Sequence, residues 1–143
     1  KGADGFMSDA EFRKFYWPTL KAVVRGLINQ GLVPLMFAEG SYDSRLEAIV
    51  DEEIPAESVI WLFDQTDMAA AKRALGGYAC IAGNVPSSLL AGGSAEDAEK
   101  YVTRLLDECA GDGGFMLTSG AVVDDAKPET LQAMIETGRA WKG

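Results

Sequence analysis

The sequence predicts an α/β protein built from four consecutive βα units. Four apolar runs each end in polar or small residues, and each is followed by a helical pattern. The runs are Leu32–Glu39, Val59–Asp64, Tyr78–Asn84 and Phe115–Ser119. Unbroken apolar runs are typical of strands buried on both faces, and helices between them make the strands parallel. Four such strands form either a small open sheet or half of a (β/α)8 barrel of the TIM type.

A capping box and a proline organise the region before the first strand. Ser8-Asp9-Ala10-Glu11 has the spacing that caps a helix start, and Pro18 is expected to break this helix soon afterwards. A second helix begins near Pro18 and ends at Gly31. Its buried face is predicted to consist of Leu20, Val23, Val24, Leu27 and Ile28.

The later helices are recognised from their caps and their apolar spacing. Asp67–Leu75 is rich in alanine, Ser94 caps a longer helix, and Pro128 opens the last one. A short helix after the first strand and one helical turn at Ser87–Leu90 complete the set. The residues expected on the core side are Leu46, Ile49, Val50, Tyr101, Val102, Leu105, Leu106, Cys109, Leu131, Met134 and Ile135. No linker interrupts this pattern, so residues 1–143 are predicted to form one domain.

Composition and charge exclude several classes of protein. The chain has 143 residues, of which 48% are hydrophobic and 24% charged, and this indicates a globular domain. Its net charge of −9 argues against binding to nucleic acid, which requires basic surfaces. No apolar run approaches the length of a membrane span. Cys80 and Cys109 suggest no disulfide framework, so we predict a cytoplasmic protein.

The chain contains no histidine. A histidine general base, a Ser–His or Cys–His pair and a histidine metal ligand are therefore excluded within these residues. The glycine motifs that bind nucleotide phosphates are absent as well. We predict neither a cofactor nor a metal, and any acid–base chemistry falls to carboxylates, Tyr, Lys or a partner chain.

Polar residues gather where the predicted strands end, which is where parallel α/β folds bind ligands. Glu39 follows an apolar run, so burial would raise its pKa and suit it to proton transfer or metal ligation. Alternatively, Glu39 pairs with Arg45 or caps the next helix. Asp64 is the second predicted catalytic carboxylate. A metal or a substrate amine could use both Asp64 and Asp67, unless Asp67 caps the helix that starts at Met68.

Other residues near the strand ends are predicted to bind the substrate. Asn84 and Ser119 would orient a ligand by hydrogen bonds. Gly120 belongs to a glycine-lined loop that could hold a phosphate or simply form a tight turn. The full predicted substrate-binding set is Tyr42, Arg45, Asp67, Asn84, Ser119 and Gly120.

Five segments form a series that runs over nearly the whole chain. They are Phe12–Pro18, Phe37–Gly40, Phe63-Asp64, Ala82–Leu90 and the helix start at Pro128-Glu129. In order and spacing they resemble the carboxyl-terminal half of the uroporphyrinogen decarboxylase superfamily. The Gly83-Asn84-x-x-x-x-x-Leu90 element is the most specific part of this resemblance.

The resemblance implies a (β/α)8 barrel of which this chain holds the last four βα units. Members of the superfamily include porphyrinogen decarboxylases and cobamide-dependent methyltransferases that bind zinc. In the decarboxylases the first half carries a catalytic aspartate and substrate-binding arginines. We therefore expect a carboxy-lyase-like protein with a small-molecule ligand, either a tetrapyrrole or a methyl donor. The alternatives are a cobamide-dependent methyltransferase and a non-catalytic α/β binding or structural module.

The chain departs from the superfamily at its functional positions. The decarboxylases have Gly-His-Gly after the final strand, where this chain has Ser119-Gly120-Ala121. The methyltransferases have His-x-Cys where this chain has Phe37-Ala38-Glu39, and a further cysteine at the position of Gly120. The three expected thiol or imidazole zinc ligands are therefore missing, and the resemblance points to a divergent branch.

An isolated half-barrel would leave its inner face and both edge strands uncovered. Burying apolar surface contributes about 25 cal/mol per Å², so association is favoured. We expect a homodimer in which two copies approximate a full barrel, another obligate oligomer, or a fragment completed by a missing amino-terminal half.

Overall fold

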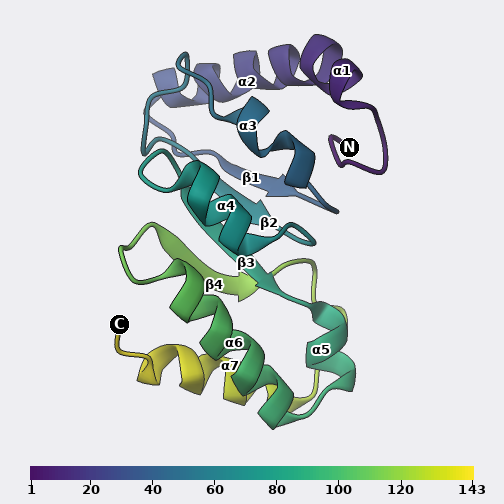
Figure 1. Ribbon diagram of the computed structural model, residues 1–143, viewed down its shortest axis with the longest axis vertical. Helices are drawn as coiled ribbons and strands as arrows, with labels where there is room; N and C mark the ends of the chain where they lie inside the picture. Colours follow the sequence, from purple (N-terminus) through teal and green to yellow (C-terminus); the bar gives the residue numbers. More distant parts are fainter.

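The computed structural model describes all of residues 1–143 and contains a parallel sheet with the strand order β1-β2-β3-β4. The strands are β1 (Leu35–Ala38), β2 (Ile60–Phe63), β3 (Cys80–Val85) and β4 (Phe115–Ser119). Each strand pairs with its neighbours in sequence, so the four strands form one continuous parallel sheet (Figure 1). The prediction of four consecutive βα units is confirmed. The strands begin and end within three residues of the predicted runs.

Helices precede, separate and follow the strands. The region before β1 contains α1 (Asp9–Glu11), the π-helix η1 (Phe12–Tyr16) and α2 (Trp17–Asn29). Between the strands lie the 3-10 helix η2 (Asp43–Arg45), α3 (Leu46–Ile49), α4 (Met68–Leu75), α5 (Ser87–Gly92) and α6 (Ala95–Cys109), and α7 (Pro128–Ala140) follows β4. In Figure 1, α3, α4 and α6 lie in front of the sheet, while α2 and α7 lie beyond its two edges. No helix has the length and apolar character needed to cross a bilayer.

The predicted break at Pro18 is wrong, because the chain stays helical from α1 through η1 into α2. Pro18 is the second residue of α2, just after η1, and has no N–H to donate to the preceding turn. The turn before it widens instead, so that the Trp17 N–H bonds to the Phe12 carbonyl. The capping boxes at Ser8 and Ser94 are both present.

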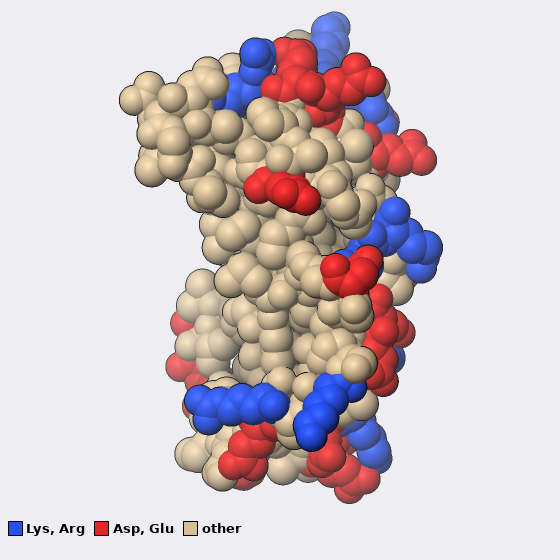
Figure 2. Space-filling model, turned by 90° about the vertical axis from the view of Figure 1, so that its left-hand side faces the viewer, with Lys and Arg blue, Asp and Glu red and all other residues tan.

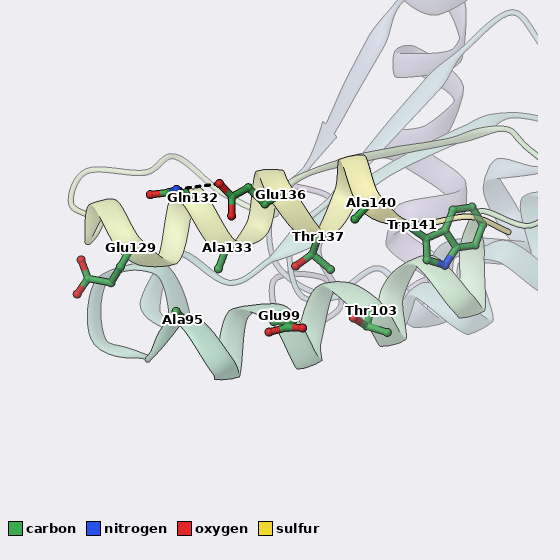
Figure 3. A pocket seen from close by; sticks show the side chains of 10 residues that line it. All are labelled: Ala95, Glu99, Thr103, Glu129, Gln132, Ala133, Glu136, Thr137, Ala140 and Trp141. Atoms are coloured by element: carbon green, nitrogen blue, oxygen red, sulfur yellow. Dashed lines mark hydrogen bonds between the residues drawn. The ribbon is translucent and has the colours of Figure 1, made fainter.

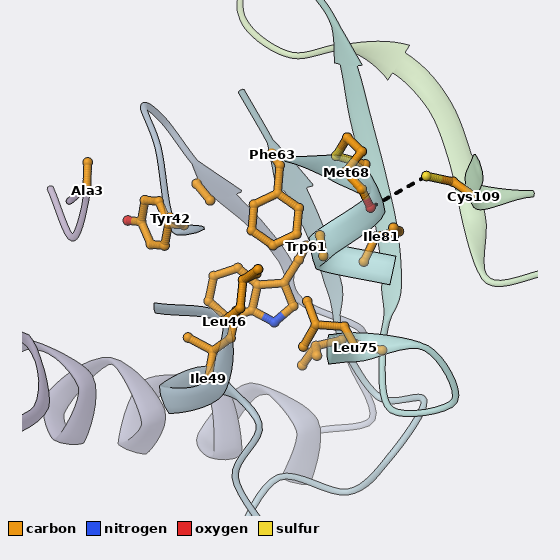
Figure 4. Close-up of a cluster of buried hydrophobic side chains, with 14 of the residues drawn as sticks. Ala3, Tyr42, Leu46, Ile49, Trp61, Phe63, Met68, Leu75, Ile81 and Cys109 are labelled. Atoms are coloured by element: carbon orange, nitrogen blue, oxygen red, sulfur yellow. Dashed lines mark hydrogen bonds between the residues drawn. The ribbon is translucent and has the colours of Figure 1, made fainter. Parts of the chain in front are cut away.

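One face of the sheet carries the core. Trp61, Phe63 and Ile81 point toward the helices, and none of them is more than 3% exposed. Phe63 and Trp61 stack on one another, and Trp61 also contacts the ring of Trp17 from α2. Figure 4 shows this cluster between the strands and the helices, with Tyr42 at one side. The aromatic rings therefore join the first helix to the centre of the sheet.

The opposite face of the sheet is open. Side chains there form two apolar levels across the strands, with Leu35, Ile60 and Cys80 in one and Phe37, Leu62, Ala82 and Met116 in the other. Phe37 is 45% exposed and Met116 47% exposed. The prediction that the strands are buried on both faces is therefore wrong for the edge strands β1 and β4, whereas Ile81–Val85 of β3 are all buried. Figure 2 shows the outline hollowed on one side, along a surface with few charged groups.

Three helical residues expected in the core lie at the surface instead. Val23 and Leu27 on α2 are exposed, and so is Ile135 on α7. Val50, which follows α3, is exposed as well. The periodicity identified apolar stripes correctly, but the stripes on α2 and α7 are wider than the core that they contact.

Candidate functional site

The carboxyl ends of the strands form a polar rim above the open face. Glu39 and Asp64 each follow the last paired residues of β1 and β2. Asn84 is paired with Thr118 between β3 and β4. These four residues therefore follow one another across the sheet, one level above Phe37 and Met116. Apolar side chains thus lie below a row of carboxylate, amide and hydroxyl groups.

Glu39 lies at the surface, with half of its side chain exposed. Its Oε1 atom accepts a hydrogen bond from the Lys1 Nζ atom at 2.7 Å. The expected burial of Glu39 is wrong, and so is the alternative pairing with Arg45. The carboxylate remains accessible from the rim, where a ligand could compete with Lys1 for it.

Asp64 links the first two strand ends. Its Oδ2 atom accepts a hydrogen bond from the Gly40 N–H at 3.0 Å, while Oδ1 has no hydrogen-bond donor from the chain. Gly40 has a φ of +87°, a conformation that favours glycine. The bond orients the Asp64 carboxylate and leaves one of its oxygens free to accept from a ligand.

Asn84 uses its amide within the chain. The Nδ2 atom donates to the Asp64 carbonyl at 3.1 Å and to the Thr66 carbonyl at 2.8 Å. The Oδ1 atom accepts from the Tyr101 hydroxyl at 3.0 Å. Burial raises the pKa of the Tyr101 phenol, which keeps it protonated as the donor. Asn84 therefore holds the β2–α4 loop to α6.

Tyr42 and Arg45 fasten the amino-terminal segment to the loop after β1. The Arg45 guanidinium is 1% exposed and donates to the Gly2 and Met7 carbonyls, at 3.1 Å and 2.6 Å. It also lies over the ring of Phe12. The Tyr42 hydroxyl accepts from the Gly2 N–H at 3.1 Å. Both side chains are thus occupied by the chain itself.

Asp67 caps α4, because its Oδ1 atom accepts from the Ala70 N–H at 3.0 Å. Its own N–H donates to the Asp43 carboxylate at 2.8 Å. Asp43, Asp64 and Asp67 all line one hollow of about 510 Å³ beside the ends of β2 and β3. No group of three or more carboxylates or thiols is arranged to hold a metal ion.

Gly120 lies where the end of β4 approaches β2. A Cβ atom at this position would be 2.8 Å from the Asp64 carbonyl oxygen and 3.2 Å from the Asn84 Cβ atom. The absence of a side chain at 120 therefore permits the rim to close between β2 and β4. Ser119 donates its hydroxyl hydrogen to the Ala121 carbonyl at 2.9 Å, which shapes the same turn.

Sequence reasoning missed several rim residues. Lys1 and Asp4 precede any recognisable element, and their contacts with the loop after β1 depend on tertiary structure. Asp43 could have been found, because it follows Tyr42 in the same predicted loop. Thr118 lies within the fourth apolar run and pairs with Asn84, so its place beside the predicted Ser119 could have been inferred as well.

A larger groove lies away from the rim, between α6 and α7. It has a volume of about 690 Å³ and is lined by alanine, threonine, glutamate and glutamine side chains, with Trp141 at one end (Figure 3). Trp141 donates its indole N–H to Asp107 at 2.9 Å. The groove therefore lies on the helix side of the molecule, away from the row of rim carboxylates.

Four parallel βα units with an open apolar face and a polar strand-end rim define half of a TIM-type barrel. The chain belongs to the uroporphyrinogen decarboxylase (URO-D) family, whose family model matches residues 2–141. No curated protein matches the chain. Fourteen chains of solved structures do match. One is a methyltransferase from Methanosarcina mazei, with a TM-score of 0.68 and 16% sequence identity. The match covers 95% of this chain and 38% of the methyltransferase chain, so these residues span well under half of that protein.

Proposed function

We propose that these residues form the ligand-binding wall of a decarboxylase-like enzyme barrel. The observation that carries the proposal is the order of side chains along the strands of the open face. Carboxylates lie at the carboxyl ends of the strands, and two apolar levels precede them. A ligand with a broad apolar surface and hydrogen-bond donors fits this order. Carboxylates accept such donors, and the apolar levels give area to bury.

Glu39 and Asp64 are the proposed catalytic residues. Glu39 is accessible, and Asp64 has one oxygen without a donor from the chain. Of the predicted substrate-binding residues, Tyr42, Arg45 and Asn84 are engaged by other parts of the chain. We propose that these three act as positioning residues that hold the two carboxylates at the rim. Asp67, Ser119 and Gly120 shape the neighbouring loops.

The proposed ligand class is a tetrapyrrole. Its pyrrole rings have apolar faces that match Phe37 and Met116, and its pyrrole N–H groups match the carboxylates. In decarboxylation the carbon–carbon bond to the carboxylate breaks, CO2 leaves, and the electron pair left on carbon takes up a proton. Glu39 is proposed as the group that supplies or relays this proton.

Closure of the barrel completes the site. The open face and the unpaired edges of β1 and β4 require a second half-barrel, which is either another copy of this chain or a different unit. A reduced, cytoplasmic setting remains part of the proposal. Both cysteines are free in the structure, which is compatible with it.

A cobamide-dependent methyltransferase is the second candidate, favoured by the Methanosarcina mazei neighbour. The likeness at 16% identity concerns the fold. Cys80 lies two levels below the rim and Cys109 is buried in α6, so neither thiol stands beside Glu39 or Asp64. In this candidate the softer metal ligands would come from the other half of the barrel.

Calorimetric titration with two probes tests the proposal. Uroporphyrin stands for the tetrapyrrole class and cobalamin for the corrinoid class. We expect uroporphyrin to bind, and Glu39→Gln and Asp64→Asn each to weaken it about tenfold, because a charge-assisted hydrogen bond contributes about 1.5–3 kcal/mol. Glu96→Gln, on the exposed face of α6, is the matched control and should leave the affinity unchanged.

Preference for cobalamin would favour the second candidate. Equal affinities for uroporphyrin in the wild type and both rim variants would contradict the assignment of Glu39 and Asp64. Failure of both probes to bind would contradict the proposed ligand class.

A further inference from the structure

Two N–H groups of the loop after β1 are held by side chains rather than by backbone carbonyls. The Gly40 N–H donates to the Asp64 carboxylate at 3.0 Å, and the Tyr42 N–H donates to the Thr66 hydroxyl oxygen at 2.9 Å. Both acceptors lie in the loop that follows β2. Asp64 and Thr66 therefore continue the attachment of β1 to β2 beyond the last paired residues of the two strands.

Backbone hydrogen bonds join the same two loops. The Asp64 N–H donates to the Ala38 carbonyl at 3.3 Å, and the Gln65 N–H donates to the Gly40 carbonyl at 3.2 Å. Gly40 is thus bonded to the loop after β2 through both its N–H and its carbonyl. Any displacement of Gly40 would move the donor that orients the Asp64 carboxylate.

Thr66 is buried, with 2% of the residue exposed, whereas Gln65 and Asp67 on either side of it are exposed. Its hydroxyl oxygen is shielded from water and serves as the acceptor for the Tyr42 N–H. A valine has nearly the same shape but would leave that buried N–H without an acceptor. The hydroxyl of Thr66 therefore fixes the chain two residues after Gly40.

Asn84 holds the loop after β2 from the side of β3. Its Nδ2 atom donates to the Asp64 carbonyl at 3.1 Å and to the Thr66 carbonyl at 2.8 Å. Both amide hydrogens are then used, and Oδ1 accepts from the Tyr101 hydroxyl at 3.0 Å. A reversed amide would place Oδ1 against two carbonyl oxygens. Tyr101 therefore stabilises the one amide orientation that holds this loop.

We propose that Thr66 and Tyr101 are positioning residues for the Asp64 carboxylate. Thr66 acts through the loop after β1, and Tyr101 acts through the amide at the end of β3. Because both act on Asp64, the proposal rests on the catalytic role proposed for that residue. Glu39 lies outside this set of bonds, since its carboxylate accepts from Lys1. Loss of either positioning residue should therefore impair Asp64 and spare Glu39.

Double-mutant cycles of uroporphyrin affinity test the proposal. We expect Thr66→Val to weaken binding about fivefold in the otherwise unchanged chain. It should have little further effect once Asp64→Asn is present, because the carboxylate that it misplaces is then gone. Combined with Glu39→Gln, the two losses should multiply. Thr66→Ser keeps the hydroxyl and should bind as the wild type does.

Tyr101→Phe and Thr103→Val complete the set of variants. Tyr101→Phe removes only the phenol hydroxyl, so we expect binding to weaken about threefold, again only while Asp64 is a carboxylate. Thr103 is exposed on α6, away from the rim. Thr103→Val is the same chemical change as Thr66→Val and should leave the affinity unchanged.

Amide hydrogen exchange at Gly40 provides a readout that needs no ligand. The bond from this N–H to Asp64 should open more often when the loops are less well held. We expect exchange at Gly40 to become about tenfold faster in Thr66→Val and about threefold faster in Tyr101→Phe. Thr66→Ser should restore the wild-type rate. Amides within α2 should keep their rates in all variants, which would show that the fold as a whole is unchanged.

Additive losses for Thr66→Val and Asp64→Asn would overturn the proposal, and so would an unchanged exchange rate at Gly40. If Thr66→Val does not fold, Tyr101→Phe carries both measurements with the same criteria. Failure of the wild type to bind uroporphyrin would count against the proposed ligand instead. The exchange rates at Gly40 would then decide the positioning role by themselves.

Discussion

The two faces of the sheet are built from the same four strands but differ in what covers them. On the helix side, Trp61, Phe63 and Ile81 are buried by the chain's own helices. On the open side, Phe37 and Met116 remain nearly half exposed. Hydrophobic pattern alone therefore does not identify a core. Alternate residues of one strand therefore differ in how far the chain itself covers them.

Truncation of one aromatic ring on each face should separate these contributions most strongly. Phe63 is fully buried and Phe37 is nearly half exposed. We expect Phe63→Ala to lower the free energy of unfolding by about 4 kcal/mol, and Phe37→Ala by less than about 1 kcal/mol. Urea denaturation of both variants measures the difference. Equal losses would mean that the open face is covered in solution.

Loss of the buried Arg45 should give the next largest effect. Arg45→Met leaves two carbonyl groups without their donor and removes the partner of Asp4 and Asp9, at a cost of about 3 kcal/mol. The exposed Arg25, which pairs with Glu53, provides the matched variant Arg25→Met, with an expected loss below about 1 kcal/mol. Similar unfolding midpoints for the two variants would contradict the role of Arg45 as a clamp.

Two glycine-to-alanine changes should have opposite signs. Gly120→Ala places a methyl group against the Asp64 carbonyl, so we expect a loss of about 1–3 kcal/mol. Gly26 lies within α2 with open space around it, and Gly26→Ala should stabilise the protein by up to about 1 kcal/mol. Thermal unfolding followed by circular dichroism compares them. A neutral Gly120→Ala variant would contradict the expected loss and would mean that the backbone near Asp64 moves to accommodate the added methyl group.

Acid should weaken the attachment of α2 through Asp51. Burial acts to raise the pKa of Asp51, but hydrogen bonds, led by that from Lys21, outweigh it and lower the pKa. A pKa lowered by folding contributes stability above the unfolded value of about 3.9, and this stability is lost as the pH falls below about 4. Asp51→Asn should therefore flatten the acid side of the urea-midpoint curve. An unchanged curve would contradict this contribution.

The repeated βα pattern was predictable because it depends on local signals. Apolar runs, the caps at Ser8 and Ser94, and the Asp67 cap each lie within a few residues of the structure that they specify. The uncovered face was harder to predict, because an unbroken run such as Leu32–Glu39 looks the same whether one side or both sides are covered. The exposure of Val23 and Ile135 also depends on which tertiary neighbours cover their helices, and local sequence spacing does not specify those neighbours.

Which residues lie at the rim was predicted better than what each of them does there. Residues at the ends of parallel strands lie together for topological reasons, and Glu39, Asp64 and Asn84 do so. Their hydrogen-bond partners come from distant segments, as in the bond from Gly40 to Asp64 and that from Tyr101 to Asn84. Sequence spacing carries no information on such pairs, so Arg45 and Asn84 were expected to face a ligand.

The contact between Lys1 and Glu39 has a practical consequence for handling the protein. It places residue 1 at the proposed ligand-binding rim, while residue 143 lies on the other side of the molecule (Figure 1). An affinity tag fused ahead of residue 1 would crowd the mouth of the site and disturb the ion pair. A tag after residue 143 would keep it clear, and immobilisation through that end should present the rim to solution.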